Sequence, residues 1–137
     1  MKILVAYDGS PAAQRALERT AQISGGLPDG KADVTVISVV PLQASGPRSA
    51  GPVATSDVEE HGRELDEAVE KLKGLGLEAK TIEAAGHIAG SIVDEADRGG
   101  FDLIVTGASG HHSMERFVGS TTTRVVSHAH CDVLVVR

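Results

Sequence analysis

The sequence has little of what nucleic-acid-binding and secreted proteins need. Only 2% of its 137 residues are aromatic, none is Trp, and the formal net charge is −6. Polyanions are bound through clustered Lys and Arg, and single strands through bases stacked on aromatic rings. Cys131 is the lone cysteine, so no internal disulfide can form, which favours a reducing compartment. We therefore expect no nucleic-acid partner and a cytoplasmic location.

Long apolar segments are also missing. The opening run, residues 1–6, is too short for a signal peptide, and no stretch approaches the length of a bilayer span. Hydrophobic residues make up 41% of the chain and charged residues 23%, close to the globular average. The composition predicts one folded domain over residues 1–137 with no membrane association.

Apolar runs and helical periodicities alternate along the chain. Strands are predicted where apolar and β-branched residues run together, and helices where apolar residues recur every three or four positions. Gly and Pro separate these segments, and Ser56 with Glu59 forms a capping box before the second helix. Strands are expected at residues 2–7, 33–40, 77–83, 103–106 and 133–136, with helices beginning near residues 10, 56, 86 and 119.

This alternation predicts an α/β fold: a doubly wound, five-stranded parallel sheet with helices on both faces. Glu78 and Lys80 place charge on the third strand, which suits a sheet edge. The expected strand order is therefore 3-2-1-4-5. In such sheets ligands bind where the winding reverses, here between the first and fourth strands.

Two Gly-containing turns should meet at that point, residues 7–10 after the first strand and residues 107–110 after the fourth. Glycine permits positive φ and a close approach of the backbone. Residues 119–121, Gly-Ser-Thr, stand where the last helix begins. Free N–H groups and hydroxyls at a helix start attract phosphate.

These two segments carry a resemblance to a known family. Residues 103–121, LIVTGASGHHSMERFVGST, resemble the nucleotide-binding signature of ATP-binding universal stress proteins, and residues 3–10, ILVAYDGS, resemble the family's opening. The family pattern is G-x2-G-x9-G-[ST]. Here the second gap, between Gly110 and Gly119, has eight residues, one fewer than the pattern.

The resemblance implies a ligand and its contacts. The ligand would be ATP or the related ADP or AMP. Slow hydrolysis is a separate possibility, in which Asp8 or a hydroxyl would help to hold Mg²⁺. Asp8 would contact the ribose or adenine, Val39 would pack on the adenine, and the phosphates would lie at the fourth-helix start. The implied site residues are Ala6, Tyr7, Asp8, Val39, Thr106, Gly107, Gly110, Gly119, Ser120 and Thr121.

The resemblance also implies a homodimer paired through the C-terminal strand, whose edge has little charge to guard it. The predicted function is a stress-response regulator in which nucleotide changes loop 41–55 and so the contacts with protein partners. Two alternatives remain: an enzyme with slow ATP hydrolysis or adenylyl transfer, and a dimeric interaction module without nucleotide, which the short gap would suit. The His residues fit no zinc spacing, so no metal site is expected in the protein itself.

Overall fold

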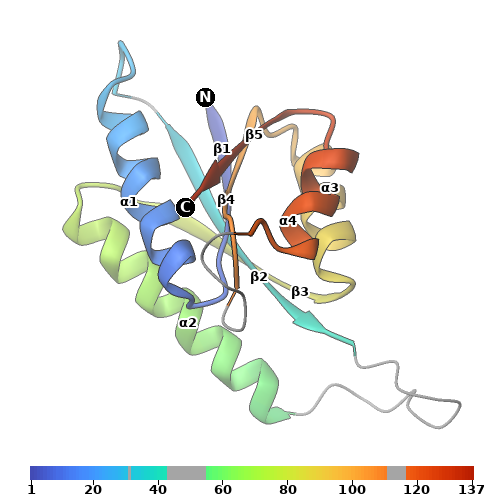
Figure 1. Ribbon diagram of the computed structural model, residues 1–137. Helices are drawn as coiled ribbons and strands as arrows, with labels where there is room; N and C mark the ends of the chain where they lie inside the picture. Colours follow the sequence, from blue (N-terminus) through green and yellow to red (C-terminus); the bar gives the residue numbers. More distant parts are fainter. Residues whose placement is uncertain (31, 43–54, 111–116) are drawn as a thin grey trace, which may run out of the picture.

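The computed structural model describes residues 1–30, 32–42, 55–110 and 117–137. Strands and helices alternate from the N-terminus to the C-terminus (Figure 1), as the sequence predicts. The elements in chain order are β1 (Lys2–Ala6), α1 (Pro11–Gly25), β2 (Asp33–Pro41), α2 (Thr55–Gly74), β3 (Ala79–Gly86), α3 (Ile88–Gly99), β4 (Leu103–Gly107), α4 (Ser120–His128) and β5 (Asp132–Val136).

The five strands form one parallel sheet in the order β3-β2-β1-β4-β5, which confirms the predicted topology. Ile3 of β1 lies opposite Val34 of β2 on one side and Leu103 of β4 on the other. β1 ends at Ala6, opposite Ile37, whereas β2 continues to Pro41. The last residues of β2 therefore extend past the end of β1 and leave a step at the carboxyl edge of the sheet.

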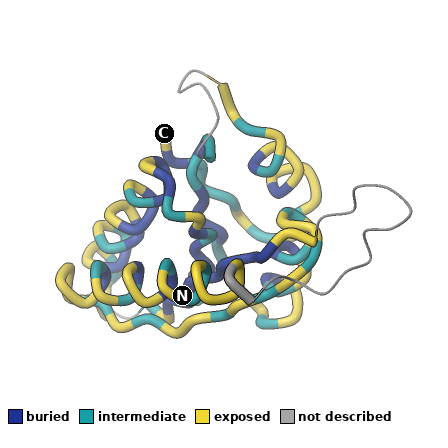
Figure 2. The backbone as a smooth tube through the Cα atoms, turned by 90° about the horizontal axis from the view of Figure 1, so that it is seen from below, coloured by how far each residue is buried: buried dark blue, intermediate teal, exposed yellow. Residues whose placement is uncertain are grey.

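Two pairs of helices cover the sheet, α1 with α2 on one face and α3 with α4 on the other (Figure 1). Successive residues of β1 serve opposite faces. Val5 packs in a core with Leu17 of α1 and Leu72 of α2, while Leu4 packs in a second core with Ile92 of α3. Figure 2 shows the buried residues along the sheet and the inner sides of the helices. Burying each such side chain contributes about 1.5–3 kcal/mol.

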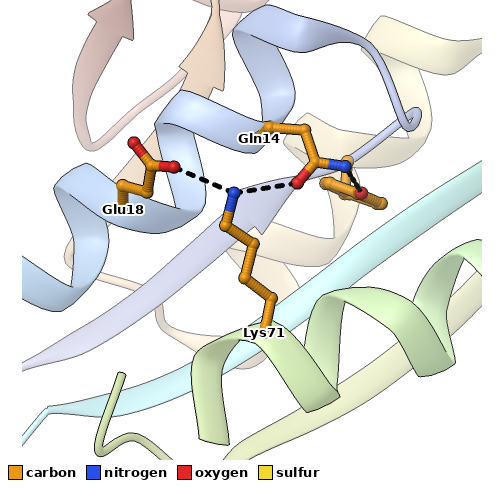
Figure 3. Close-up of polar contacts among 4 residues, drawn as sticks. Gln14, Glu18 and Lys71 are labelled. Carbon is orange, nitrogen blue, oxygen red and sulfur yellow. Dashed lines mark hydrogen bonds and ion pairs between the residues drawn. The ribbon is translucent and has the colours of Figure 1, made fainter. Parts of the chain in front are cut away.

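A lysine joins the two helices of the first face. Lys71 on α2 donates from Nζ to Glu18 Oε1 and to Gln14 Oε1 on α1, each at 2.9 Å (Figure 3). The Lys71 and Glu18 side chains are 30% and 53% exposed, so this pair contributes at most about 1 kcal/mol. Its main effect is to hold the Gln14 amide in one orientation.

Some element limits and exposures differ from the prediction. β3 spans Ala79–Gly86 instead of residues 77–83, because the long β2 offers it pairing partners as far as Pro41. α2 begins at Thr55, one residue before Ser56, the predicted N-cap. Val58 and Val126 continue an apolar spacing but are 41% and 50% exposed. Helical spacing predicts which side of a helix faces the sheet. It does not predict which residues along that side lie above the sheet and become buried.

Candidate functional site

The turns that follow β1 and β4 lie against each other. Gly9 has a φ of +78°, and Asp8 Oδ1 accepts a hydrogen bond from Ser10 N at 2.9 Å, which forms the tight turn into α1. A Cβ placed on Gly110 would lie 3.2 Å from Asp8 Oδ2, and one on Gly107 would lie 2.8 Å from the Ala12 Cβ. The two turns predicted to meet are therefore in contact, and the Gly residues allow it.

The two helices that begin here differ in how their first N–H groups are used. In α1, Ser10 Oγ accepts from Ala13 N at 3.2 Å, and Pro11 has no N–H to satisfy. In α4, the N-cap is Gly119, which has no side chain to cap the helix. The first N–H bonded within α4 is that of Thr123, which donates to Gly119 O at 3.0 Å. Among the described residues, the first N–H groups of α4 after Gly119 have no hydrogen-bond acceptor, whereas α1 is capped by its own residues.

Short hydrogen bonds fix the start of α4 to the end of β4. Gly119 N donates to Ala108 O at 2.7 Å, and Thr122 Oγ1 donates to Gly107 O at 2.8 Å. Ala108 N donates in turn to Val136 O of β5 at 2.7 Å. The donors of the first turn of α4 are therefore held in place before any ligand arrives, which lowers the entropic cost of binding.

A cavity of about 540 Å³ opens where these turns meet, within the range of small-molecule sites. Its walls come from the carboxyl ends of β1, β2 and β4 and from all four helices. The structure brings all ten residues singled out from the sequence to this one cavity: Ala6, Tyr7, Asp8, Val39, Thr106, Gly107, Gly110, Gly119, Ser120 and Thr121. Whether they hold a ligand remains a prediction.

Part of the cavity lining is apolar. Ile37 and Val39 reach it from β2, and Ile88 and Ile92 reach it from α3. The start of α4 adds N–H groups and the hydroxyls of Ser120 and Thr121 to the same lining. Such a cavity suits a ligand with a flat apolar group at one end and an anionic group at the other. Ile88 is 38% exposed, although its helical spacing predicts a buried position.

Three cavity residues from α2 were not among those singled out: Glu60, His61 and Glu64. His61 Nδ1 lies 2.5 Å from Ser38 Oγ, and Ser38 is fully buried in β2. The Nδ1 atom also lies 3.8 Å from Glu64 Oε2. In the sequence these residues belong to a charged helical stretch that reads as a solvated face. No local signal shows that the first turns of α2 extend over the end of β2.

Tyr7 lies at the base of the cavity and is 4% exposed. Its phenol oxygen accepts a hydrogen bond from Gln14 Nε2 at 2.7 Å, and Gln14 is held by Lys71. Burial raises the pKa of the Tyr7 phenol, and the carboxylates of Glu67, Glu64 and Asp8 raise it further. Tyr7 is therefore neutral at physiological pH.

Two sequence predictions fall on residues that the structure does not describe: the positive charge that His111, His112 and Arg116 could add near the phosphates, and residues 43–54 of the loop 41–55 that nucleotide is expected to change. Among the residues that the structure does describe, no three His, Cys, Asp or Glu side chains are grouped as metal ligands. In those same ranges, no helix has the length and apolarity needed to cross a bilayer.

Comparisons with known proteins agree with this geometry. The model of the universal stress protein family matches residues 1–137. A universal stress protein of Methanocaldococcus jannaschii is 30% identical over 138 residues, which cover 99% of this chain and 81% of that protein.

Among solved structures, the universal stress protein UspA from Lactobacillus plantarum superposes with a TM-score of 0.76 at 32% identity, covering 100% of this chain and 97% of its own. The universal stress protein of Archaeoglobus fulgidus, in complex with dAMP, superposes with a TM-score of 0.78 at 26% identity, covering 100% and 98%. Fold, family match and sequence identity over the full length agree, and the chain belongs to the universal stress protein family.

Proposed function

We propose that this protein binds an adenine nucleotide, with ATP as the expected ligand and ADP or AMP as related ones. One observation supports the proposal: the start of α4, which has no side-chain cap, and the turn after β1 line a single cavity whose wall also includes Ile37, Val39 and Ile92. A related structure of this fold holds dAMP, which has the same two chemical parts. Adenine would pack on the apolar residues of the lining, and the phosphates would lie at the start of α4.

The net charge of −6 does not oppose this assignment. A helix N-terminus carries roughly half a positive charge at hydrogen-bonding distance. Surface carboxylates are screened over about 8 Å at physiological salt. The overall negative charge therefore has little effect on a phosphate at the start of α4, where the nearby N–H donors attract it.

Each site residue has an assigned role in this proposal. Asp8 contacts the ribose or adenine beside the backbone of Ala6 and Tyr7, and Val39 packs on the adenine. Thr106 and Gly107 form the floor under the ribose and first phosphate. The phosphate chain is held by Gly110, Gly119, Ser120 and Thr121. Mg²⁺ would be bound by the phosphates, with Asp8 or a hydroxyl completing its oxygen ligands.

The biological role that we propose is regulation of the stress response in the cytoplasm, through protein contacts that depend on the bound nucleotide. Efficient hydrolysis is not expected, because residues 103–121 contain no Lys to neutralise charge at the phosphates. Slow hydrolysis or adenylyl transfer is the enzyme alternative, and release of phosphate or pyrophosphate would reveal it.

We also propose a homodimer formed through β5. This strand lies at the edge of the sheet, and Val133, Leu134 and Val135 are only partly buried. An apolar edge without guarding charges tends to pair with another strand. Sedimentation at micromolar concentration should give twice the mass of the chain, and a monomeric mass would contradict the dimer.

Calorimetric titration of dialysed protein with ATP, ADP and AMP, with and without Mg²⁺, tests the proposed function. Gly119→Val provides the matched variant. The fold should persist, because the φ of −66° at Gly119 accepts a side chain and the N–H can still bond Ala108 O. The new side chain should block the phosphates. Gly25→Val, where nothing lies within 4 Å, is the control. Normal binding by Gly119→Val would refute the phosphate site, and no binding by the unaltered protein would favour the interaction module.

A further inference from the structure

The α2 wall of the cavity carries charge and hydrogen-bonding groups that the proposed nucleotide contacts leave without a role. Glu60, His61 and Glu64 line the cavity from α2, across from the apolar Ile88 and Ile92 of α3. The space between these two walls lies over the carboxyl end of β2. A group lying there has an apolar surface on one side and a polar edge on the other.

Ser38 determines which nitrogen of His61 carries the proton. Ser38 is fully buried, and among the described residues His61 Nδ1, at 2.5 Å, is the partner that the structure gives its hydroxyl. A buried hydroxyl proton without an acceptor costs about 1–3 kcal/mol. Ser38 therefore donates to Nδ1, and neutral His61 carries its proton on Nε2. The second ring nitrogen is then a donor on a side chain that lines the cavity.

The charges of this wall decide which part of a nucleotide it faces. The carboxylates of Glu60 and Glu64 repel phosphate, whereas the start of α4 attracts it. The phosphates consequently lie away from α2, and the nucleoside lies beside it. This step rests on the proposed function.

We propose that His61 is a specificity-determining residue that donates a hydrogen bond from Nε2 to an acceptor of the nucleoside. The acceptor is a base ring nitrogen or the ribose 2′ oxygen. Ser38 is a positioning residue, because it fixes the tautomer and the ring orientation from within the sheet. An analogue that lacks this acceptor leaves the Nε2 donor unpaired and should bind more weakly.

The experiment measures the affinity of four proteins for a set of AMP analogues. The proteins are the unaltered chain, His61→Leu, His61→Gln and Ser38→Ala, and the ligands are AMP, its 2′-deoxy form and its 1-, 3- and 7-deaza forms. His61→Leu should weaken AMP binding about five- to tenfold, the value of one neutral hydrogen bond. His61→Gln, which can place an N–H near the position of Nε2, should stay within about twofold. Ser38→Ala should lose about two- to threefold, since the imidazole remains but is no longer held.

The analogues separate recognition from a general structural effect. The analogue without the relevant acceptor should bind the unaltered protein more weakly than AMP does. Its affinity should not fall further in His61→Leu, because the hydrogen bond is already missing. If that is the 2′-deoxy form, the acceptor is on the ribose, and if it is a deaza form, the acceptor is on the base. Urea midpoints of all four proteins check that they are folded.

Two results would overturn this inference while the proposed function stands: unchanged AMP affinity in His61→Leu, or an equal loss for every analogue. Failure of the unaltered protein to bind any nucleotide would instead remove the proposed function, and this inference with it. If His61→Leu does not fold, Ser38→Ala still tests the inference. A Ser38→Ala protein that binds AMP and every analogue as tightly as the unaltered protein would contradict the positioning role of Ser38.

Discussion

Gly107→Ala should destabilise the protein, although it adds only one methyl group. Gly107 ends β4, and a Cβ there would lie 2.8 Å from Ala12 Cβ and 2.9 Å from the Ala12 carbonyl carbon. The second of these is a backbone atom in the first turn of α1, so it cannot move aside as a side-chain tip would. The methyl group must push α1 away from β4, and the cavity lies at this junction.

The size of the effect follows from the cost of overpacking. An extra methylene in a well-packed region typically costs about 1–3 kcal/mol. For 137 residues, an unfolding entropy of about 2.1 cal/mol/K per residue gives roughly 0.29 kcal/mol/K. The expected decrease in Tm is therefore roughly 3–10 °C. Nucleotide affinity should fall as well, because the same displacement separates the turns after β1 and β4.

Thermal and urea unfolding followed by circular dichroism measure the free energy of unfolding, with Gly62→Ala as the control. Gly62 lies inside α2, and its nearest neighbour would be Glu83 Oε2 at 3.9 Å, so alanine fits there. Replacing a helical Gly by Ala should stabilise the protein by about 0.5–1 kcal/mol. The same substitution should thus have opposite signs at the two sites. A Gly107→Ala protein as stable as the unaltered one would refute the argument from contact.

Three further predictions concern single side chains. Tyr7 is the sole tyrosine and there is no Trp, so absorbance at alkaline pH follows the ionisation of Tyr7 alone. Because burial raises the pKa of this phenol, the titration midpoint should lie above the ordinary value of about 10. Stability owed to neutral Tyr7 is complete below that ordinary value and is lost as pH rises through the raised one. Lys71→Met, which breaks the contacts with Glu18 and Gln14, should lower the free energy of unfolding by less than about 1 kcal/mol in urea titrations. Burial raises the pKa of the Cys131 thiol, so it should react with maleimide at pH 7 more slowly than free cysteine.

The sheet order could be predicted because the residue types of a strand indicate whether it lies inside the sheet or at its edge. The uninterrupted apolar run of β1 requires cover on both faces, which places it inside the sheet, and Lys80 on β3 suits an edge, whereas Glu78 lies just before that strand. Asp8-Gly9 and Gly119 stand at element ends, where parallel topology alone brings them to one crevice. Their convergence on one cavity follows from chain order and not from packing detail.

The α2 wall could not be predicted, because it depends on where a long helix lies above the sheet. His61 enters the cavity because α2 begins beyond the end of β1 and packs on β2, and no spacing within residues 55–74 encodes that offset. The exposure of Val58 has the same cause. Local periodicity gives a rotation about the helix axis, whereas position along the axis is set by tertiary packing.

The pairing of β1 with β4 also determines when the cavity can form during synthesis. Ile3 lies opposite Leu103, so the contact that creates the crevice spans 100 residues (103 − 3). Contacts between residues so far apart in the chain form late, because closing the long loop between them costs conformational entropy. A nascent chain that ends after β3 has no crevice and cannot gain stability from nucleotide. Under the proposed function, cellular nucleotide would therefore bind only after the last helix has emerged, and it would then stabilise the completed sheet over partly assembled forms.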